Sequence, residues 1–448
     1  MNKKISLSDL RFFEMKLFLI TLIFVTSINL LSSQGEKKFF DPMDVFDLSW
    51  ASDPQVSPDG KTIVYVRKSN NIMFDNTSSN LWQISVDGKH HQPLFSGLNN
   101  YKSPRWSPDG KKLAFISDES DTNQIHIRWL DSSESAVISN LQESPSSLSW
   151  SPNGKWLAFT MNVKSPIEPI VEPRSKPDGA EWAERPITIV NTRYQYDGQG
   201  IVDPAYRHVF IVSSDGGSVR QLTNGDFNHN GSLTWSLDSQ QVYFSAYRSN
   251  NWELVSNEAD IYSVDIETGE LDQITSQSGA ERSPTMSPNG KYIAFSSQER
   301  RPLAFTPKRI ALAETQNKEI RILSESLDGD ADNIIWAEDG QSLYFSYDEK
   351  GIRNIGEIAL NGKYEKIIAG LGGTTIGRPY LSGGFHVANN IFAYTHGESD
   401  RPSDIGVIRN NQKTVITSLN KNLLGHRKLG MVNEITYNSS FDGQEIQG

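Results

Sequence analysis

The chain has 448 residues, no cysteine and a formal net charge of -11 at neutral pH. The absence of cysteine excludes disulfide bonds and lipid-modified cysteines, and an acidic chain without a run of Lys or Arg lacks the clustered cations that nucleic-acid binding requires. The eight histidines show no metal-ligand spacing, so the sequence predicts no metal site and no cofactor.

An apolar stretch over residues 17–31 stands near the N-terminus and is followed by two serines. It is shorter than the roughly 20 apolar residues of a membrane span, and polar residues interrupt it. It therefore predicts a secretory signal peptide over residues 1–33, with Met15 as an alternative start. A retained N-terminal anchor is the other interpretation. We expect a periplasmic or secreted protein.

Residues 41–50, DPMDVFDLSW, predict a short helix. Asp41 can cap it, Pro42 suits the first helical position, and Asp44 lies near the positive end of the helix dipole.

An eleven-residue pattern then recurs along most of the chain. Its copies are VSPDGKTIVYV, WSPDGKKLAFI, WSPNGKWLAFT, WSLDSQQVYFS, MSPNGKYIAFS and WAEDGQSLYFS, whose second residues are 57, 107, 151, 236, 287 and 337. The steps are 50, 44, 85, 51 and 50 residues. Periods of 40 to 50 residues are typical of propellers.

Each copy predicts a β-hairpin, because Ser-Pro-Asp-Gly suits a type I turn between two strands. Two further strand-like runs follow in each unit, for example residues 124–130 and 135–139. Four short antiparallel strands per repeat form one blade of a propeller. The recurrent Trp is predicted to pack between blades.

A seventh unit lacks the turn motif but has the same pattern of four strand-like segments, with strands expected at 379–384, 391–396, 404–409 and 413–418. The sequence thus predicts an all-β, seven-bladed propeller of four-stranded blades over residues 40–430. Six and eight blades are the alternatives.

The 85-residue step indicates an insertion, residues 162–206, between the second and third strands of blade three. Because antiparallel strands alternate in direction, this loop should leave the ring on the face opposite the Ser-Pro-Asp-Gly turns. Long loops in compact domains are usually functional or disordered. This one is rich in aromatic and charged residues.

The segment DGDADN, residues 328–333, resembles the start of a calcium-binding loop. Its sixth residue is Asn333, where such a loop needs Gly, so no calcium site is predicted. The last residues, 431–448, alternate like a strand pair and end without a polar tail, which we interpret as a cut through a continuing polypeptide.

These features resemble the propeller of the prolyl oligopeptidase family of serine peptidases, in its dipeptidyl-peptidase and acylaminoacyl-peptidase-like branches. The resemblance rests on the SPDGK and SPNGK repeats, on TRYQYDGQG (192–200) with the RHVFIVSSDGGSVRQLTNGD that follows it (207–226), and on the terminal ITYNSSFDGQEIQG. The SPDG repeat alone is shared with TolB-like propellers. Together these features span residues 40–448.

The resemblance implies an α/β-hydrolase domain after residues 431–448, with a catalytic Ser on a G-x-S-x-G turn. That pentapeptide does not occur in the 448 residues, so no catalytic residue is assigned here and the chain alone is expected to be inactive. The propeller would then gate the access of peptide substrates. The alternative is a free-standing TolB-like envelope propeller that acts as a protein-binding scaffold. Homo-oligomerisation stays open.

The candidate substrate-binding residues all lie in the insertion: Glu181, Glu184, Arg185, Arg193 and Tyr194. The resemblance suggests that an acidic pair from the propeller holds the N-terminal amine of a substrate. Here the two glutamates stand as EWAE and are not adjacent, and solvated loop carboxylates are the ordinary alternative. The aromatic and cationic residues could present surfaces and charges to a peptide.

Overall fold

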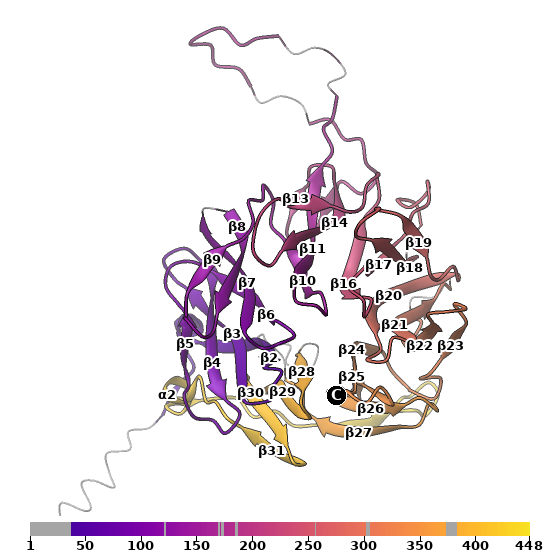
Figure 1. Cartoon of the computed structure of the whole chain (residues 1–448). Coiled ribbons are helices and arrows are strands. Elements are labelled where there is room, and N and C mark those ends of the chain that lie inside the picture. Colours follow the sequence, from indigo (N-terminus) through magenta and orange to yellow (C-terminus); the bar gives the residue numbers. More distant parts are fainter. Residues whose placement is uncertain are drawn as a thin grey trace, which may run out of the picture.

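The computed structural model describes residues 37–120, 122–168, 171, 174–183, 187–255, 257–301, 305–372 and 383–448. The predicted signal peptide lies outside these residues. Within them, seven four-stranded antiparallel sheets follow one another around a ring (Figure 1). This confirms the all-β, seven-bladed propeller.

The first four blades are given from the innermost to the outermost strand. Blade 1 consists of β2 (Ser49–Val56), β3 (Thr62–Asn71), β4 (Asn76–Ser85) and β5 (Gln92–Phe95). Blade 2 consists of β6 (Tyr101–Trp106), β7 (Lys112–Ser120), β8 (Thr122–Trp129) and β9 (Ser135–Val137). Blade 3 consists of β10 (Ser146–Trp150), β11 (Trp156–Lys164), β14 (Ala205–Ser213) and β15 (Arg220–Gln221). Blade 4 consists of β16 (His229–Trp235), β17 (Gln241–Ala246), β18 (Asp260–Asp265) and β19 (Leu271–Gln273).

The remaining three blades continue in the same order. Blade 5 consists of β20 (Gly279–Met286), β21 (Tyr292–Glu299), β22 (Arg309–Glu314) and β23 (Ile320–Ile322). Blade 6 consists of β24 (Ala331–Trp336), β25 (Ser342–Glu349), β26 (Ile352–Ala359) and β27 (Tyr364–Ala369). Blade 7 consists of β28 (Phe385–Ala388), β29 (Ile391–Glu398), β30 (Arg401–Arg409) and β31 (Gln412–Val415).

Three short strand pairs and two short helices lie outside the blades. The pairs are β1 (Lys38–Phe39) with β32 (Arg427–Lys428), β12 (Gln195–Tyr196) with β13 (Gly200–Ile201), and β33 (Thr436–Asn438) with β34 (Glu445–Gln447). The helices are the 3-10 helix η1 (Pro42–Asp47) and α2 (Lys421–Leu424). No helix in the described ranges is both long and apolar enough to cross a bilayer.

The segment predicted as a helix over residues 41–50 is shorter in the structure. Asp41 accepts a hydrogen bond from the amide of Met43, and Asp44 accepts one from the amide of Asp41, which together form a capping box. The 3-10 helix ends at Asp47, and the last two residues of the predicted helix begin strand β2.

The repeated turn is held by its own side chains. In the first copy, the Ser57 hydroxyl donates to Asp59 at 2.6 Å and accepts from the amide of Thr62 at 3.0 Å. Gly60 closes the turn through its amide to the Ser57 carbonyl, with φ at +69°, a conformation that glycine adopts without strain. The sequence motif thus specifies the turn between the first two strands of the blades that carry it.

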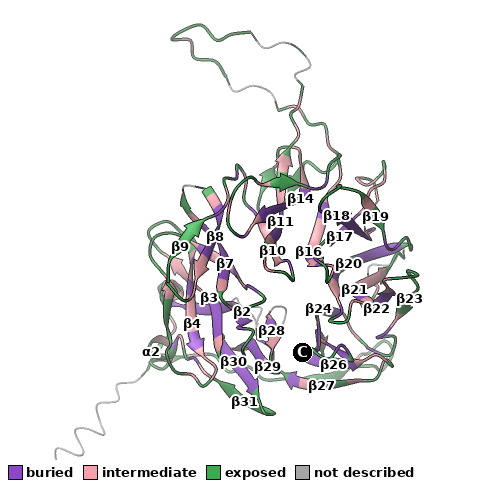
Figure 2. Ribbon diagram, viewed as in Figure 1, coloured by how far each residue is buried: buried purple, intermediate pink, exposed green. Residues whose placement is uncertain are grey.

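The second strand of each blade contributes an aromatic residue to the core. Six of these side chains are fully buried: Tyr65, Phe115, Phe159, Phe244, Phe295 and Phe345. Figure 2 shows the buried residues concentrated on the inner and middle strands of the blades, with exposed residues on the outer edges and loops. Each of these six residues belongs to a different apolar cluster, and each cluster packs two neighbouring blades together.

The recurrent Trp residues join neighbouring blades, as predicted. Each indole N–H donates to a backbone carbonyl of the innermost strand of the preceding blade. These bonds are Trp106 to Gln55 (3.1 Å), Trp150 to Arg105 (3.0 Å), Trp235 to Ser149 (3.2 Å) and Trp336 to Thr285 (3.0 Å). Trp235 and Trp336 are buried, whereas Trp106 and Trp150 are only half-buried because they border the central channel.

Blade 7 begins later than predicted. Residues 379–382 lie outside the described part of the chain, and the innermost strand is β28, not 379–384. A two-residue turn at Asn389 and Asn390, both with positive φ, connects β28 to β29. This is the geometry of a type I′ hairpin, which Asn favours. It replaces the Ser-Pro-Asp-Gly turn of the other blades.

Each blade is built from strands that follow one another in the chain, so no blade combines strands from both ends. The ring closes through contacts between blades 7 and 1. Asn420 accepts from the amide of Ser49 (2.9 Å) and donates to its carbonyl (2.6 Å). Arg427 forms a bidentate ion pair with Asp44, in which its Nε and Nη2 atoms donate to the two carboxylate oxygens at 2.5 and 2.6 Å. The parallel pair β1 and β32 extends this contact.

Candidate functional site

The insertion leaves blade 3 between β11 and β14, as predicted. The two strands are longer than expected, since residues 162–164 pair with 205–207, so the loop proper runs over residues 165–204. The amide of Ser165 donates to the carbonyl of Pro204 at 2.9 Å and closes the neck of the loop. Figure 1 shows the loop standing far out from the ring.

Three parts of the chain lie on the face from which the insertion emerges. The second strand of every blade starts at a Ser-Pro-Asp-Gly-type turn, or its Asn-Asn equivalent, and ends on the opposite face, where the insertion begins. The innermost strand β2 starts on that same face, and the outermost strand β31 ends on it, because neighbouring strands are antiparallel. The insertion and both segments that leave the ring therefore share one face, the insertion face.

The base of the insertion rests on a loop of blade 4, residues 247–259. The amide of Thr192 donates to the Glu253 carboxylate at 3.1 Å, and the Arg193 guanidinium donates to the Val255 carbonyl at 3.3 Å. Tyr206 meets Trp252 edge to face, with ring centroids 6.0 Å apart. Two loops that are distant in sequence thus form one structure.

A cavity of about 630 Å³ lies between the insertion base and the ends of the strands of blades 3 and 4. Its wall combines aromatic rings, amides and guanidinium groups: Tyr194, Tyr196, Trp252, Asn228, Arg193 and Arg207. A smaller hollow of about 120 Å³ shares Arg193 and Trp252 with it and extends to Glu258 and Arg282. Such a mixture offers both apolar contact and hydrogen bonds, as peptide-sized ligands require.

The structure brings together two of the five predicted site residues. Arg193 and Tyr194 both line the cavity. Glu181 lies further out on the loop and is exposed. Glu184 and Arg185 lie outside the described residues, so their part in the site stays a prediction.

Sequence reasoning missed the contribution of blade 4, which supplies Trp252, Glu258 and Asn228 to these cavities. A signal was present. The segment between the second and third strands of blade 4 is itself long, contains a Trp, and must emerge on the same face as the insertion of the neighbouring blade.

A buried histidine, His229, and a half-buried arginine, Arg248, contact each other next to the cavity-lining residues Arg207 and Asn228. The Nδ1 of His229 lies 2.8 Å from the carbonyl oxygen of Arg207, so that nitrogen carries the proton and donates. Its Nε2 accepts from Arg248 at 2.6 Å. Burial lowers the pKa of His229 to about 4, which keeps the ring neutral in this arrangement.

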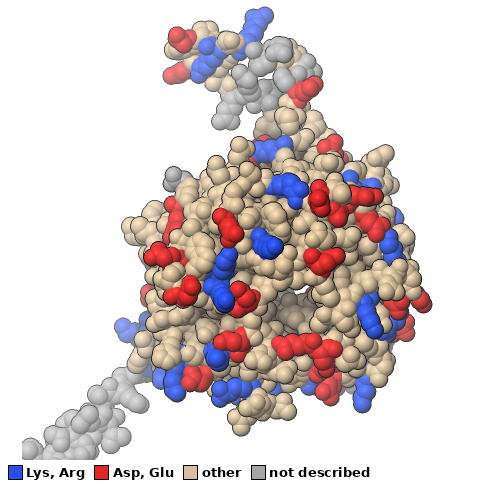
Figure 3. Space-filling model, viewed as in Figure 1, with Lys and Arg blue, Asp and Glu red and all other residues tan. Residues whose placement is uncertain are grey.

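A second cavity, of about 960 Å³, occupies the centre of the ring and is lined by the innermost strands. Figure 3 shows the hollow at the centre of the molecule. An ion pair in its wall joins Arg105 of blade 2 to Asp53 of blade 1 at 2.9 Å. His386 of blade 7 accepts from the amide of Val56 at 3.2 Å, and desolvation lowers its pKa to about 4.

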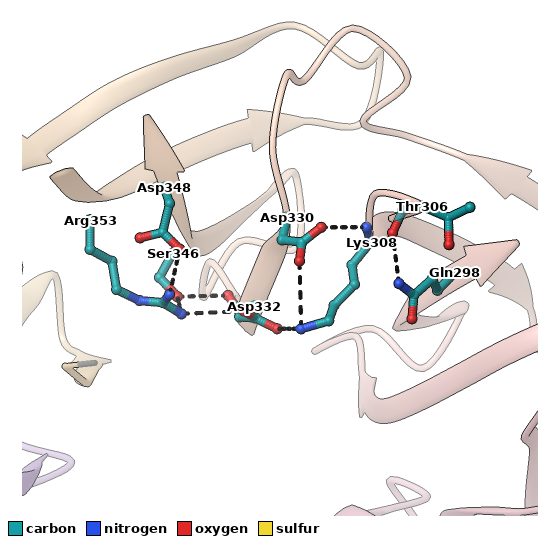
Figure 4. Close-up of polar contacts among 8 residues, drawn as sticks. All are labelled: Gln298, Thr306, Lys308, Asp330, Asp332, Ser346, Asp348 and Arg353. Carbon is teal, nitrogen blue, oxygen red and sulfur yellow. Dashed lines mark hydrogen bonds and ion pairs between the residues drawn. The ribbon is translucent and has the colours of Figure 1, made fainter. Parts of the chain in front are cut away.

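The acidic residues of the segment 328–333 are engaged by cations (Figure 4). Lys308 of blade 5 lies 3.2 Å from Asp332 and 3.8 Å from Asp330. Arg353 pairs with Asp332 at 3.4 Å and with Asp348 at 3.0 Å. This network joins blades 5 and 6. In the ranges that the structure describes, no group of three or more His, Cys, Asp or Glu could hold a metal ion.

Comparison with known proteins identifies the architecture. The family described as the dipeptidyl peptidase IV N-terminal region matches residues 41–142 and 187–301. Dipeptidyl-peptidase 5 of Porphyromonas gingivalis is 25% identical over 403 residues, which cover 84% of this chain and 55% of that protein. An uncharacterised peptidase of Bacillus subtilis, YuxL, is 28% identical over 47% of this chain and 31% of its own length. The chain thus spans about half or less of the length of these relatives.

Solved structures show the same fold at low sequence identity. An acylaminoacyl peptidase in complex with Z-Gly-Gly-Phe-chloromethyl ketone superposes with a TM-score of 0.71 at 16% identity, covering 91% of this chain and 58% of that one. The β-propeller domain of the trilobed protease of Pyrococcus furiosus, described as having an open velcro topology, gives a TM-score of 0.56 at 15% identity, covering 84% of this chain and 98% of that one. Residues 41–142 and 187–301 of this propeller are therefore similar to the dipeptidyl peptidase IV N-terminal region, and the ring as a whole has the fold seen in the acylaminoacyl peptidase.

Proposed function

We propose that this propeller is the substrate-admitting part of a peptidase, with the insertion face turned toward a catalytic domain. One observation carries the proposal. The insertion, the cavity beneath it and both segments that leave the ring lie on one face. A substrate that enters a site above this face must pass the cavity wall.

Exposed apolar side chains on that face support a covering domain. Met73 and Phe74, at the tip of the long β3–β4 hairpin, are 81% and 72% exposed, and Met431 is 90% exposed. Met431 also lines a groove of about 470 Å³, together with Phe39 and Leu424, among others. Soluble proteins rarely leave apolar surface of this kind uncovered unless it meets a partner.

The cavity chemistry supports peptides as the admitted molecules. Arg193 and Asn228 can bond to peptide carbonyls, and Trp252 and Tyr194 offer flat apolar surfaces to side chains. The proposal predicts that Trp252→Ala and Arg193→Ala each lower kcat/KM for peptide substrates of the complete protein about tenfold, which corresponds to about 1.4 kcal/mol.

Lys155→Ala, in the turn of blade 3 on the opposite face, is the matched control and should leave kcat/KM unchanged. Equal kinetics for all three variants and the parent would contradict the entrance role. Residues 1–448 alone should neither hydrolyse peptide chromogenic substrates nor react with a serine-directed phosphonate probe. Hydrolysis with labelling would contradict the assignment of catalysis to another domain.

We also propose export across the cytoplasmic membrane, on the strength of the apolar stretch at residues 17–31. Mass spectrometry of the N-terminus in cell fractions tests it. A mature chain that starts near residue 34 in the periplasm or medium supports export. An intact N-terminus found only in the cytoplasm contradicts it.

A further inference from the structure

Two carboxyl groups meet at the junction of blades 4 and 5. Asp260 begins strand β18 of blade 4, and Glu281 lies on β20, the innermost strand of blade 5. A short parallel bridge holds the two segments together: the amide of Ala259 donates to the Gly279 carbonyl at 3.1 Å, and the amide of Glu281 donates to the Ala259 carbonyl at 2.7 Å. Glu281 is 1% exposed.

Burial raises the pKa of Glu281, and the two carboxyl groups lie close enough for the charge of Asp260 to raise this pKa further. Asp260 Oδ2 accepts from Gln273 at 3.1 Å. Asp260 Oδ1 and Glu281 Oε2 are buried and find no donor among the described residues. Because two ionised carboxylates are acceptors only, the contact between them requires a proton.

Burial is the main reason that the pKa of Asp260 rises to about 6 and that of Glu281 to about 7. The negative charge of Glu258 raises both further, although Arg300 pairs with Glu258 at 3.2 Å. The other titratable or charged groups on the elements packed around the pair are Tyr262, Arg248, Asp272 with Lys318, Arg282, and Glu299 with Arg301.

The propeller repeat shows that this position does not need a carboxyl group. Glu281 pairs with Ser297 just before the bulge of the innermost strand. The residues in the same register of blades 1, 2, 4 and 6 are Ala51, Tyr101, His229 and Ala331. Each fits the same blade architecture, so the acid pair is a feature of this junction and not of the fold.

We propose that Asp260 and Glu281 share one proton and act as a pH-sensitive latch, which holds the blade 4 loop, residues 247–259, against blade 5. As the pH rises toward neutral and the shared proton passes to solvent, two adjacent buried carboxylates repel each other and the loop is released. The same loop carries Trp252, Val255 and Glu258, which line the cavities beneath the insertion. The latch therefore couples pH to the shape of that wall.

Only the consequence for substrate entry rests on the proposed function, since the latch itself is a property of the propeller. The experiment needs no activity. Hydrogen exchange of a peptide covering residues 247–262 is followed between pH 5.5 and 8.5, with correction for the intrinsic rate. The shared proton favours the closed loop, so the opening constant rises by up to tenfold per pH unit between the ordinary carboxyl pKa of the open loop, about 4, and the raised pKa of the closed pair, about 7. Protection should therefore fall by about tenfold from pH 5.5 to pH 6.5 and become constant above about pH 7.5.

Glu281→Gln should remove this pH dependence, because its amide can donate to Asp260 without a titrating proton. Asp260→Asn is a second variant that keeps the contact. Glu299→Gln, on the neighbouring strand β21, is the matched control and should behave like the parent. Protection profiles for both latch variants that run parallel to the parent across the pH range would overturn the proposal, as would a pH-independent parent. A further outcome is an exchange profile as predicted, together with changes in the cavity wall that leave peptide hydrolysis by the complete protein unaltered. That result would contradict the proposed function and leave the latch standing.

Discussion

The junction that closes the ring differs from the junctions that the Trp repeat provides. Four junctions are joined by an indole that donates to a carbonyl of the preceding blade. The closing junction of blades 7 and 1 has Val56 at the Trp position and is held by Asn420 and by the ion pair of Arg427 with Asp44. All of these junctions bury apolar side chains, and at the closing junction Ile63 and Tyr65 of blade 1 pack with Ile405 of blade 7. The closing junction differs because polar contacts between residues more than 300 positions apart are added to this burial.

The largest expected effect is on a Trp junction. Trp235→Ala removes a buried aromatic side chain between blades 3 and 4 and should lower the free energy of unfolding by roughly 3–5 kcal/mol, the usual range for such core truncations. Denaturant titration measures it. Trp235→Phe, which keeps most of the apolar area and loses the hydrogen bond, should cost much less. An unfolding curve for the Ala variant that matches the parent would contradict the role of this Trp in the core.

We expect the second-largest loss in the free energy of unfolding from a change at the closing junction. Asn420→Ala leaves the buried amide and carbonyl of Ser49 without partners, at roughly 1–3 kcal/mol for each group. We expect a loss of about 2–4 kcal/mol in the same titration. Gln412→Ala, at an exposed position of β31, is the control. If both variants unfold together with the parent, Asn420 does not close the ring.

Trp106→Ala should cost less than Trp235→Ala, about 1–2 kcal/mol, because the ring is only half-buried beside the channel. The comparison of the two Trp variants separates burial from hydrogen bonding, since both indoles make the same bond to the preceding blade. Equal losses would show that the hydrogen bond dominates.

The smallest effect is confined to acid pH. The hydrogen bonds from Arg427 are the main reason that the pKa of Asp44 falls to about 2. A depressed carboxyl pKa stabilises the folded protein above the unfolded value, near 4, and this contribution is lost as the pH falls from about 4 to about 2. Asp44→Asn should therefore flatten the acid side of the melting-temperature profile. An unchanged acid slope would show that the pair does not stabilise the closing junction.

Much of the fold could be predicted because the repeat encodes its own turn. Ser57, Asp59 and Gly60 hold the turn through contacts within five residues, so the motif is readable wherever it occurs. Blade 7 was misplaced by several residues because Asn389 and Asn390 make its turn through backbone conformation alone. The helix predicted over residues 41–50 was too long because Ser49 and Trp50 pair with β3, a tertiary contact that local capping signals do not encode.

The candidate site was predictable only in part. The length and composition of the insertion located Arg193 and Tyr194, because both belong to the inserted segment itself. Trp252 and Glu258 come from another blade, and only the folded ring brings them to the same cavity. The closing contacts of Asn420 and the acid pair of Asp260 with Glu281 were missed for the same reason. Each joins residues whose sequence neighbours give no sign of the partner.

The central claim is that peptides bind on the insertion face, and the absence of cysteine allows a direct measurement. Thr188→Cys in the cavity wall and Lys155→Cys in the turn on the opposite face each provide one site for an environment-sensitive fluorophore. We predict that titration with a mixed-sequence hexapeptide changes the signal saturably at position 188 and not at position 155. Saturation at position 155, or no saturable change at position 188, would contradict the account.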